Sequence, residues 1–141
     1  MLTLLTRDEC RLVQASFAQI EPVAEHFATK FYERLFTLNP NLVPLFKGDM
    51  EKQGVRFMEK LAVAVVGLED LESIASLVQR LGRRHAGYGV EPAHYEIARE
   101  ALLWALEEGL GPAFDAEVCG AWSAAFTTIS AEMIRASQGG S

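Results

Sequence analysis

Histidine is the residue type in this sequence best suited to bind a metal ion. The chain has three histidines, His26, His85 and His94, and two isolated cysteines, Cys10 and Cys119. These residues argue against a zinc site built from protein ligands alone, which needs about four Cys, His or acidic side chains. Haem needs fewer protein ligands, because the porphyrin supplies four nitrogens and the protein one axial side chain. We therefore consider haem as the cofactor that these residues could hold.

His85 is the best-placed candidate for an axial ligand. Four apolar residues precede it at helical spacing, namely Ile74, Leu77, Val78 and Leu81. This stripe predicts that His85 points into an apolar interior, where burial favours the neutral, ligating imidazole. Its second ring nitrogen could donate to the Leu81 carbonyl and so orient the ring. The alternative is an ordinary core histidine satisfied by that carbonyl. His26 lies among surface residues and His94 in the first turn of a helix, so we expect both to be solvated.

Two polar residues, Tyr32 and Gln53, lie in otherwise apolar helical surroundings. A buried hydroxyl or amide needs a hydrogen-bonding partner, which a bound ligand could supply. Alternatively, Tyr32 extends its hydroxyl to water and Gln53 is simply exposed in a first helical turn. Phe46 could stack on a cofactor or belong to the core. Three arginines, at positions 56, 83 and 84, could pair with haem propionates or simply face solvent.

Capping residues and prolines divide the chain into helices. Thr6 and Glu9 form a capping box, and Pro22, Pro40 and Pro92 suit first helical turns. We expect helices over about 6–20, 22–38, 50–67, 70–87, 92–110 and 115–135, with a short one after residue 40. No alternating pattern predicts strands, so the fold class is all-α with seven or eight helices. Residues 1–136 form a single domain, and 137–141 are expected to be a disordered tail.

Composition limits the possible partners and the location. The formal net charge is −6 and the pI is about 5.1, which argues against nucleic acid as a partner. The longest apolar run, residues 61–68, is far shorter than the ~20 residues needed to cross a bilayer. The first ten residues lack the pattern of an export signal. We therefore expect a cytoplasmic protein that does not bind membranes, with reduced thiols.

Several short segments, taken in order, resemble a globin over nearly the whole chain. They are Phe31-Tyr32-Glu33-Arg34-Leu35-Phe36, Pro44-Leu45-Phe46, Gln53, Leu81-Gly82-Arg83-Arg84-His85, Leu110-Gly111-Pro112-Ala113-Phe114 and Ala121-Trp122. The resemblance is closest to neuroglobin-like single-domain globins of bacteria and to the haem domain of flavohaemoglobins. It implies a globin fold around a haem pocket, with haem b as the cofactor.

The resemblance also implies roles for individual residues. His85 corresponds to the proximal ligand of the iron and Phe46 to the phenylalanine that packs on the haem plane. Tyr32, Gln53 and Phe57 correspond to distal residues that would line the site of a diatomic ligand. A glutamine therefore stands where many globins have a distal histidine, so the sixth coordination position should be open in the ferrous form. The full set of expected haem contacts is Phe46, Gln53, Arg56, Phe57, Leu81, Arg84, His85, Val90 and Tyr95.

One departure concerns the proximal side. Flavohaemoglobins have a tyrosine early in the seventh helix, which Tyr95 matches, and a glutamate late in the last helix near the proximal histidine. Glu132 lies too early in the sequence to match this glutamate. The resemblance therefore does not imply a glutamate–histidine pair here.

Three functions follow from the resemblance. The first is reversible binding of O2, and of CO or NO, for storage, transport or sensing. The second is nitric oxide dioxygenase activity, which would require a separate reductase to re-reduce the iron. The third is a haem-free regulatory module with a globin fold. The visible spectrum of the purified protein distinguishes the third from the other two.

Overall fold

The computed structural model describes residues 5–138, and this part of the chain is all-α. Its six α-helices are α1 (Arg7–Ile20), α2 (Ala24–Leu38), α3 (Met50–Gly67), α4 (Leu71–Gly87), α5 (Pro92–Leu110) and α6 (Ala116–Ser137). Three short 3₁₀ segments are η1 (Glu21–Val23), η2 (Pro40–Leu45) and η3 (Gly111–Ala113). The expected seven or eight helices are thus reduced to six α-helices. Residues 139–141 of the predicted tail lie outside the described residues.

The short helix expected after residue 40 is a 3₁₀ segment and not an α-helix. Asn39 caps this segment by accepting from the backbone N–H of Asn41, but Pro44 lies inside it and has no N–H to donate. The segment therefore forms the six residues of 3₁₀ helix η2 and ends at Phe46. This tight turn places Phe46 at the corner that leads into α3.

The starts of α1, α3 and α6 follow their capping signals, whereas Asp70 before α4 makes no side-chain cap bond. Thr6 and Glu9 form the predicted capping box at the start of α1. Asp49 accepts from the backbone of Glu51 at the start of α3, and Asp115 caps α6 in the same way. These side chains satisfy backbone N–H groups that have no partner within the helix.

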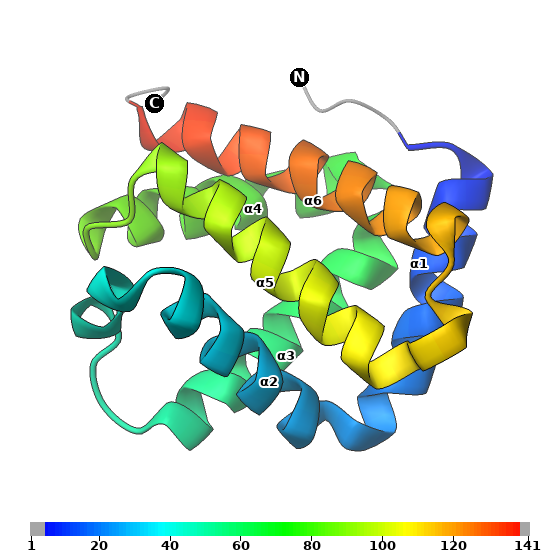
Figure 1. Cartoon of the computed structure of the whole chain (residues 1–141). Helices are drawn as coiled ribbons and strands as arrows, with labels where there is room; N and C mark the ends of the chain where they lie inside the picture. Colours follow the sequence, from blue (N-terminus) through cyan, green and yellow to red (C-terminus); the bar gives the residue numbers. More distant parts are fainter. Residues whose placement is uncertain (1–4, 139–141) are drawn as a thin grey trace.

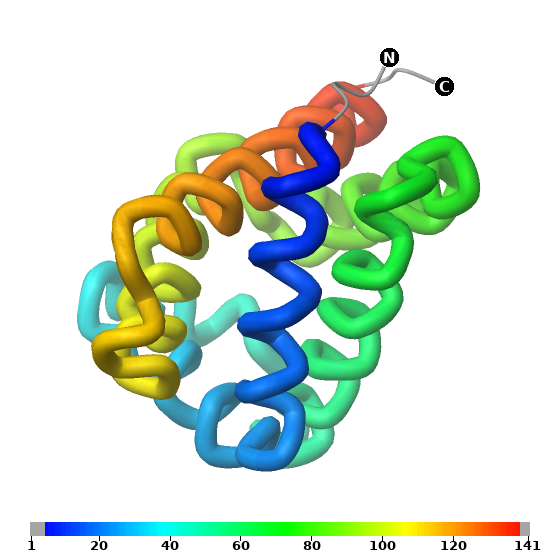
Figure 2. Tube along the Cα trace, turned by 90° about the vertical axis from the view of Figure 1, so that its right-hand side faces the viewer, coloured from blue at the N-terminus to red at the C-terminus, as the bar shows by residue number. Residues whose placement is uncertain are grey.

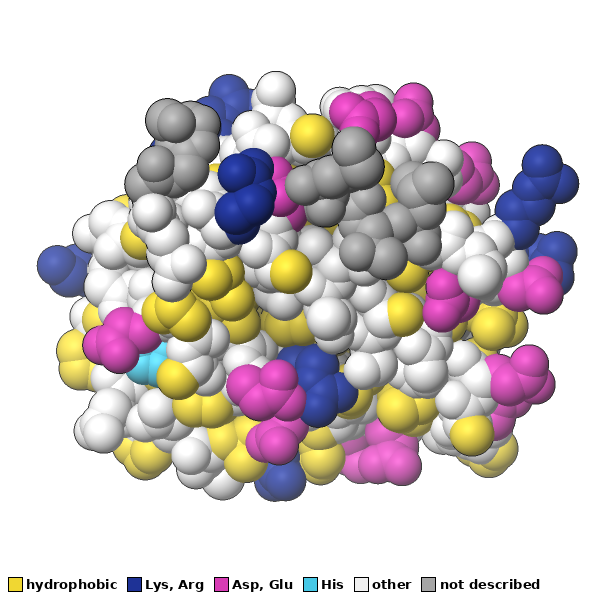
Figure 3. All heavy atoms as spheres, turned by 90° about the horizontal axis from the view of Figure 1, so that it is seen from above, with side chains coloured by type: hydrophobic (Ala, Val, Ile, Leu, Met, Phe, Trp, Pro, Cys, Tyr) yellow, Lys and Arg dark blue, Asp and Glu magenta, His cyan; other side chains and the backbone are white. Residues whose placement is uncertain are grey.

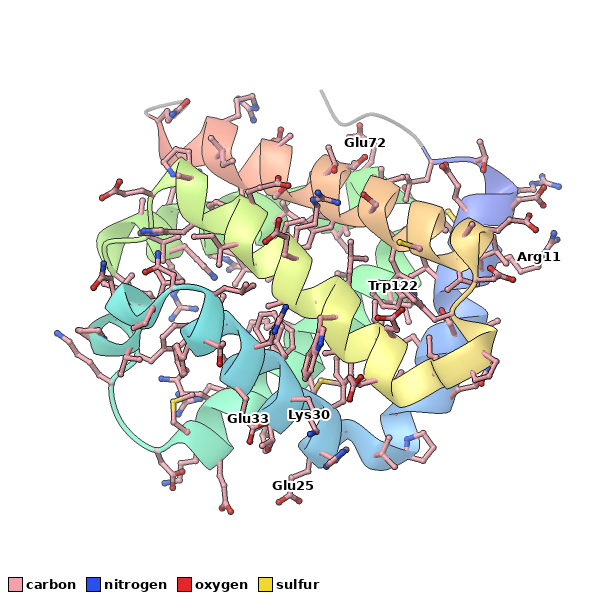
Figure 4. All side chains as sticks on the ribbon, in the orientation of Figure 1. Arg11, Glu25, Lys30, Glu33, Glu72 and Trp122 are labelled. Atoms are coloured by element: carbon pink, nitrogen blue, oxygen red, sulfur yellow. The ribbon has the colours of Figure 1, made fainter. Side chains whose placement is uncertain are left out.

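The helices cross obliquely around one core. In Figure 1, α5 runs between α2 and α6, and Figure 2 shows α1 with α6 on one side and α3 on the other. The side chain of Trp122, labelled in Figure 4, joins α6 to α1 because its Nε1 donates to Ser16 Oγ at 2.8 Å inside the core. The most buried large side chains are Ile20, Leu71, Leu106, Val13 and Val78.

The surface carries charges of both signs. On the face seen from above, acidic and basic side chains lie among small groups of apolar ones (Figure 3). Three ion pairs are present among the described residues, each between side chains three positions apart on one helix. No helix within residues 5–138 is both long and apolar enough to span a membrane.

Candidate functional site

His85 lies in the last turn of α4 with one ring nitrogen already occupied. Its Nδ1 is 2.7 Å from the Leu81 carbonyl oxygen, the bond that the four-residue spacing predicts. Among the described residues, Nε2 has no hydrogen-bonding partner. Burial lowers the pKa of the half-buried His85 and so favours the neutral ring. The neutral ring donates from Nδ1 and therefore presents an unprotonated Nε2, the form of imidazole that binds metals.

The turn after His85 orients the residues that follow it. The backbone N–H groups of Tyr88 and Val90 both donate to the His85 carbonyl oxygen, each at 3.0 Å. Gly89 between them has φ +95°, which a side chain would disfavour. The predicted contact residue Val90 thus lies directly after the turn. Tyr95 follows in the first turn of α5, with its ring centroid 6.3 Å from that of His85.

A second group of predicted site residues forms an aromatic cluster. The ring of Tyr32 on α2 lies 5.4 Å from Phe46 at the corner and 5.9 Å from Phe57 on α3, between centroids. Phe31 and Phe36 complete the cluster, at 5.2 Å and 6.1 Å from Tyr32. The structure therefore brings together the three predicted residues Tyr32, Phe46 and Phe57.

The Tyr32 hydroxyl is a neutral, available donor. Burial among these rings raises the pKa of Tyr32 to about 12, so the phenol stays protonated at neutral pH. No residue of the described chain forms a hydrogen bond with this hydroxyl. A half-buried hydroxyl without a protein partner is suited to donate to a bound ligand.

Gln53 is engaged elsewhere. Its side-chain Nε2 donates to the Lys47 carbonyl oxygen at 2.8 Å, and its backbone N–H donates to Asp49. The amide therefore ties the first turn of α3 to the corner that precedes it. Within residues 5–138 no hydrogen bond joins Gln53 to Tyr32, so the structure does not pair these two predicted distal residues through their polar groups. In the sequence, the position of Gln53 in a first helical turn is the one sign of its bond to Lys47.

The aromatic corner and the turn after His85 lie at the same end of the molecule. A Cβ atom placed on Gly89 would be 3.3 Å from Leu45 Cδ2, which puts η2 against the α4–α5 turn. Figure 1 shows these two segments together at the left of the view. The turn that follows His85 and the segment that precedes Phe46 are therefore neighbours.

The remaining charged and polar candidates have distinct surroundings. Arg56 and Arg84 are exposed, each one residue before a predicted site residue, and neither has an ion-pair partner in the described part of the chain. His94 Nδ1 accepts from the backbone N–H of Glu91 at 3.0 Å and so caps α5. His26 is exposed. These contacts leave His85 as the histidine suited to bind a metal.

The interface between α4 and α6 contains a hydrogen bond that sequence reasoning missed. Glu132 on α6 is buried, with 5% of its surface exposed, and it accepts from Gln79 Nε2 at 2.8 Å and from Arg135. It contacts α4 two turns before His85 and not His85 itself. No local pattern in the sequence predicts this hydrogen bond, because Gln79 and Glu132 are 53 positions apart.

These residues fit haem. One free imidazole nitrogen supplies the single axial ligand that haem requires. Large apolar side chains from α2, η2, the corner, α3, α4 and α5 are only partly buried, which leaves apolar surface that a porphyrin could cover. They include Tyr32, Phe36, Leu45, Phe46, Phe57, Leu61, Leu81, Tyr95 and Leu103.

Comparison with known proteins identifies the family. A model of the globin family matches residues 29–133, which is most of the chain. The chain is a globin. The match spans α2 to α6 and includes the aromatic cluster, His85 and the α4–α6 contact.

Bacterial proteins are among the relatives of this globin. A flavohemoprotein of Vibrio cholerae is 29% identical over 126 residues, which are 87% of this chain and 32% of that protein. The globin therefore spans about a third of the length of this relative. The solved structure of a bacterial globin from Campylobacter jejuni has a TM-score of 0.83 at 25% identity and covers 95% of this chain and 97% of its own.

A second solved structure shows the same fold. It is an engineered carbene transferase made from a candidate nitric oxide dioxygenase of Rhodothermus marinus, with a TM-score of 0.87 at 23% identity. It covers 97% of this chain and 95% of its own. The expected globin fold is thus confirmed.

Proposed function

We propose that this globin binds haem b through His85 and binds O2 reversibly on the side of Tyr32. The observation that carries the proposal is the state of His85. Its Nδ1–H is committed to the Leu81 carbonyl oxygen at 2.7 Å, which leaves an unprotonated Nε2 in half-buried, apolar surroundings. When bound, haem supplies a ferrous iron that can take up O2, CO or NO at its sixth position.

The chain's own residues then control this position. The neutral Tyr32 hydroxyl would donate a hydrogen bond to the ligand, because it has no partner among the described residues and its pKa is raised to about 12. Phe46 and Phe57, packed edge-on and tilted against Tyr32, would keep water away. Arg56 and Arg84 are exposed and available to pair with the haem propionates.

The visible spectrum of the purified protein tests this proposal. We expect a strong Soret band, and a reversible change of the ferrous spectrum when O2 is added and removed. His85→Ala should lose stoichiometric haem, whereas His94→Ala should keep it, because His94 only caps α5. A protein that cannot take up haem even when haem is added would refute the proposal and favour the haem-free regulatory module.

Nitric oxide dioxygenase activity is the second candidate, because flavohemoproteins and the Rhodothermus marinus protein are among the relatives. The reaction NO + O2 + e⁻ → NO3⁻ balances with one electron, which a separate reductase would supply. Rapid mixing of the O2-saturated ferrous protein with NO should yield one nitrate per protein without a reductase. Repeated turnover only when a reductase and its reductant are added would establish the enzyme. Failure to form nitrate even once would leave reversible O2 binding.

A further inference from the structure

The orientation of His85 depends on how α4 is held, because the histidine ring is tied to its own helix. The bond from Nδ1 to the Leu81 carbonyl oxygen stays within α4. Its ring also faces Tyr95 on α5, but only loosely, at 6.3 Å between centroids. When α4 rotates about its axis, the Leu81 carbonyl and the His85 ring turn with it. The direction of Nε2 therefore follows the rotation of α4.

The helix that holds α4 is α6. Gly82 lies against the α6 backbone so closely that an added Cβ would be 2.6 Å from Met133 Cα and 2.7 Å from its carbonyl carbon. The absence of a side chain at Gly82 lets the two backbones meet. This contact fixes the distance between the helices at Gly82, where a glycine surface adds little resistance to rotation beyond that of the buried side chains Ile74 and Val78.

The hydrogen bond between Gln79 and Glu132 adds a directional restraint in the half of α4 that carries His85. Gln79 Nε2 donates to Glu132 Oε2 at 2.8 Å, one turn before Gly82. Successive residues three apart in an α-helix are displaced by about 60° in the same sense, so Gln79, Gly82 and His85 form an oblique stripe with the glycine contact in the middle. A rotation that carries His85 one way carries Gln79 away from Glu132.

Glu132 is itself held rigidly. Arg135 Nε donates to Oε1 at 2.8 Å and Arg135 Nη2 to Oε2 at 2.5 Å, so both carboxylate oxygens are engaged. Hydrogen bonds from Arg135 lower the pKa of this buried carboxyl to about 2, and the Gln79 bond adds to the effect. The carboxylate stays charged at neutral pH, and a hydrogen bond to a charged group is stronger than one to a neutral group.

We propose that Glu132 is a positioning residue for His85: by holding Gln79 it fixes the rotation of α4 on α6 and thereby the direction of the His85 Nε2. The inference rests on the proposed function, because it assigns the consequence to an iron bound at His85. Neither Glu132 nor Gln79 touches the ligand. The effect reaches the site through the rotation of one helix.

The test reverses the polarity of this hydrogen bond. Gln79→Glu places two carboxylates against each other, whereas the double variant Gln79→Glu with Glu132→Gln restores a carboxylate–amide pair in the opposite sense. The ferrous, ligand-free holoprotein is examined by resonance Raman spectroscopy, whose iron–histidine stretching band reports the orientation of the axial imidazole. We expect Gln79→Glu to shift or broaden this band and the double variant to restore it. Arg80→Gln, on the exposed face of α4, should leave the band in place.

Amide hydrogen exchange of the haem-free protein provides a second readout that does not depend on haem. Loss of a hydrogen bond to a buried charge should speed exchange in α4 by about 10- to 150-fold. Gln79→Leu, which introduces no repulsion, serves if Gln79→Glu does not fold, and exposed Arg80→Gln is its control on the same helix.

The two readouts separate the failure of this proposal from failure of the proposed function. Faster exchange in α4 with an unchanged iron–histidine band in the Gln79 variants would make Glu132 merely stabilising and would overturn the positioning role. Unchanged exchange would overturn the restraint itself. A protein that binds no haem but shows faster exchange on Gln79→Glu would refute the proposed function while supporting the restraint on α4.

Discussion

Replacing Tyr32 by phenylalanine removes one hydroxyl and keeps the aromatic cluster, whose centroids lie 5.2–6.1 Å from the Tyr32 ring. O2 bound at a ferrous haem is a partly negative acceptor, whereas CO carries much less charge. A hydrogen bond to a charged acceptor contributes about 1.5–3 kcal/mol. Since each ~1.4 kcal/mol is a factor of ten, Tyr32→Phe should speed O2 release by about 10- to 150-fold. CO release should change only a few-fold.

Stopped-flow displacement of O2 by CO measures the first rate, and displacement of CO by NO measures the second. Tyr88→Phe is the matched control, because Tyr88 is 62% exposed and its hydroxyl should not face the ligand. Since the pKa of Tyr32 is raised to about 12, its hydroxyl should act as a donor unchanged from pH 6 to pH 9. Equal O2 release from Tyr32→Phe and the parent protein would show that Tyr32 does not reach the ligand. An equal acceleration of O2 and CO release would indicate a disturbed pocket instead of a lost hydrogen bond.

Three further predictions concern the surrounding structure. Gln53→Leu should change O2 release less than Tyr32→Phe does in the same assay, because its amide bonds a corner carbonyl at 2.8 Å; a larger effect would contradict this orientation. Gly82→Ala should destabilise the fold by about 2 kcal/mol or more in urea unfolding, whereas Gly120→Ala, with open space around it, should stabilise by about 0.5–1 kcal/mol. Hydrogen bonds from Arg135 lower the pKa of Glu132 from 4.5 to about 2, so its contribution is complete above pH 4.5 and is lost as the pH falls towards 2. With Arg135 half exposed and screened, Glu132→Gln should remove about 1–2 kcal/mol of the stability difference between pH 7 and pH 3 in the haem-free protein.

The elements that local sequence signals determine were predicted closely. Asp49 and Gly67 bound α3, and Pro92 opens α5, at the residues expected. Capping and proline chemistry act within one helical turn, so they can be read from a few neighbouring residues. The segment from 40 to 45 was harder, because it is too short for helical periodicity to decide between α and 3₁₀ geometry. That difference accounts for the loss of the seventh helix expected.

The candidate site divides in the same way. The bond between His85 and Leu81 joins residues four apart on one helix, so the sequence predicts it. The Gln53 bond depends on how the corner places the Lys47 carbonyl oxygen, six residues away in an irregular segment. Backbone geometry of this kind is not encoded in residue type, so Gln53 could be matched to a distal position by resemblance but not oriented.

The contact between Gln79 and Glu132 is the part of the site that the sequence predicts least. Its partners are 53 residues apart, and neither a motif nor a periodicity connects them. A glycine in the middle of a helix is the one local sign, since Gly82 weakens α4 as a helix and is tolerated where another backbone comes close. The apolar stripe of α4 predicts from sequence that His85 faces inward. The direction of its ring depends on the packing of α4 against α6, which only the folded chain shows. If that division is correct, substitutions on α6 that touch neither haem nor ligand should alter the iron–histidine band, while equally conservative substitutions on the exposed face of α4 should not.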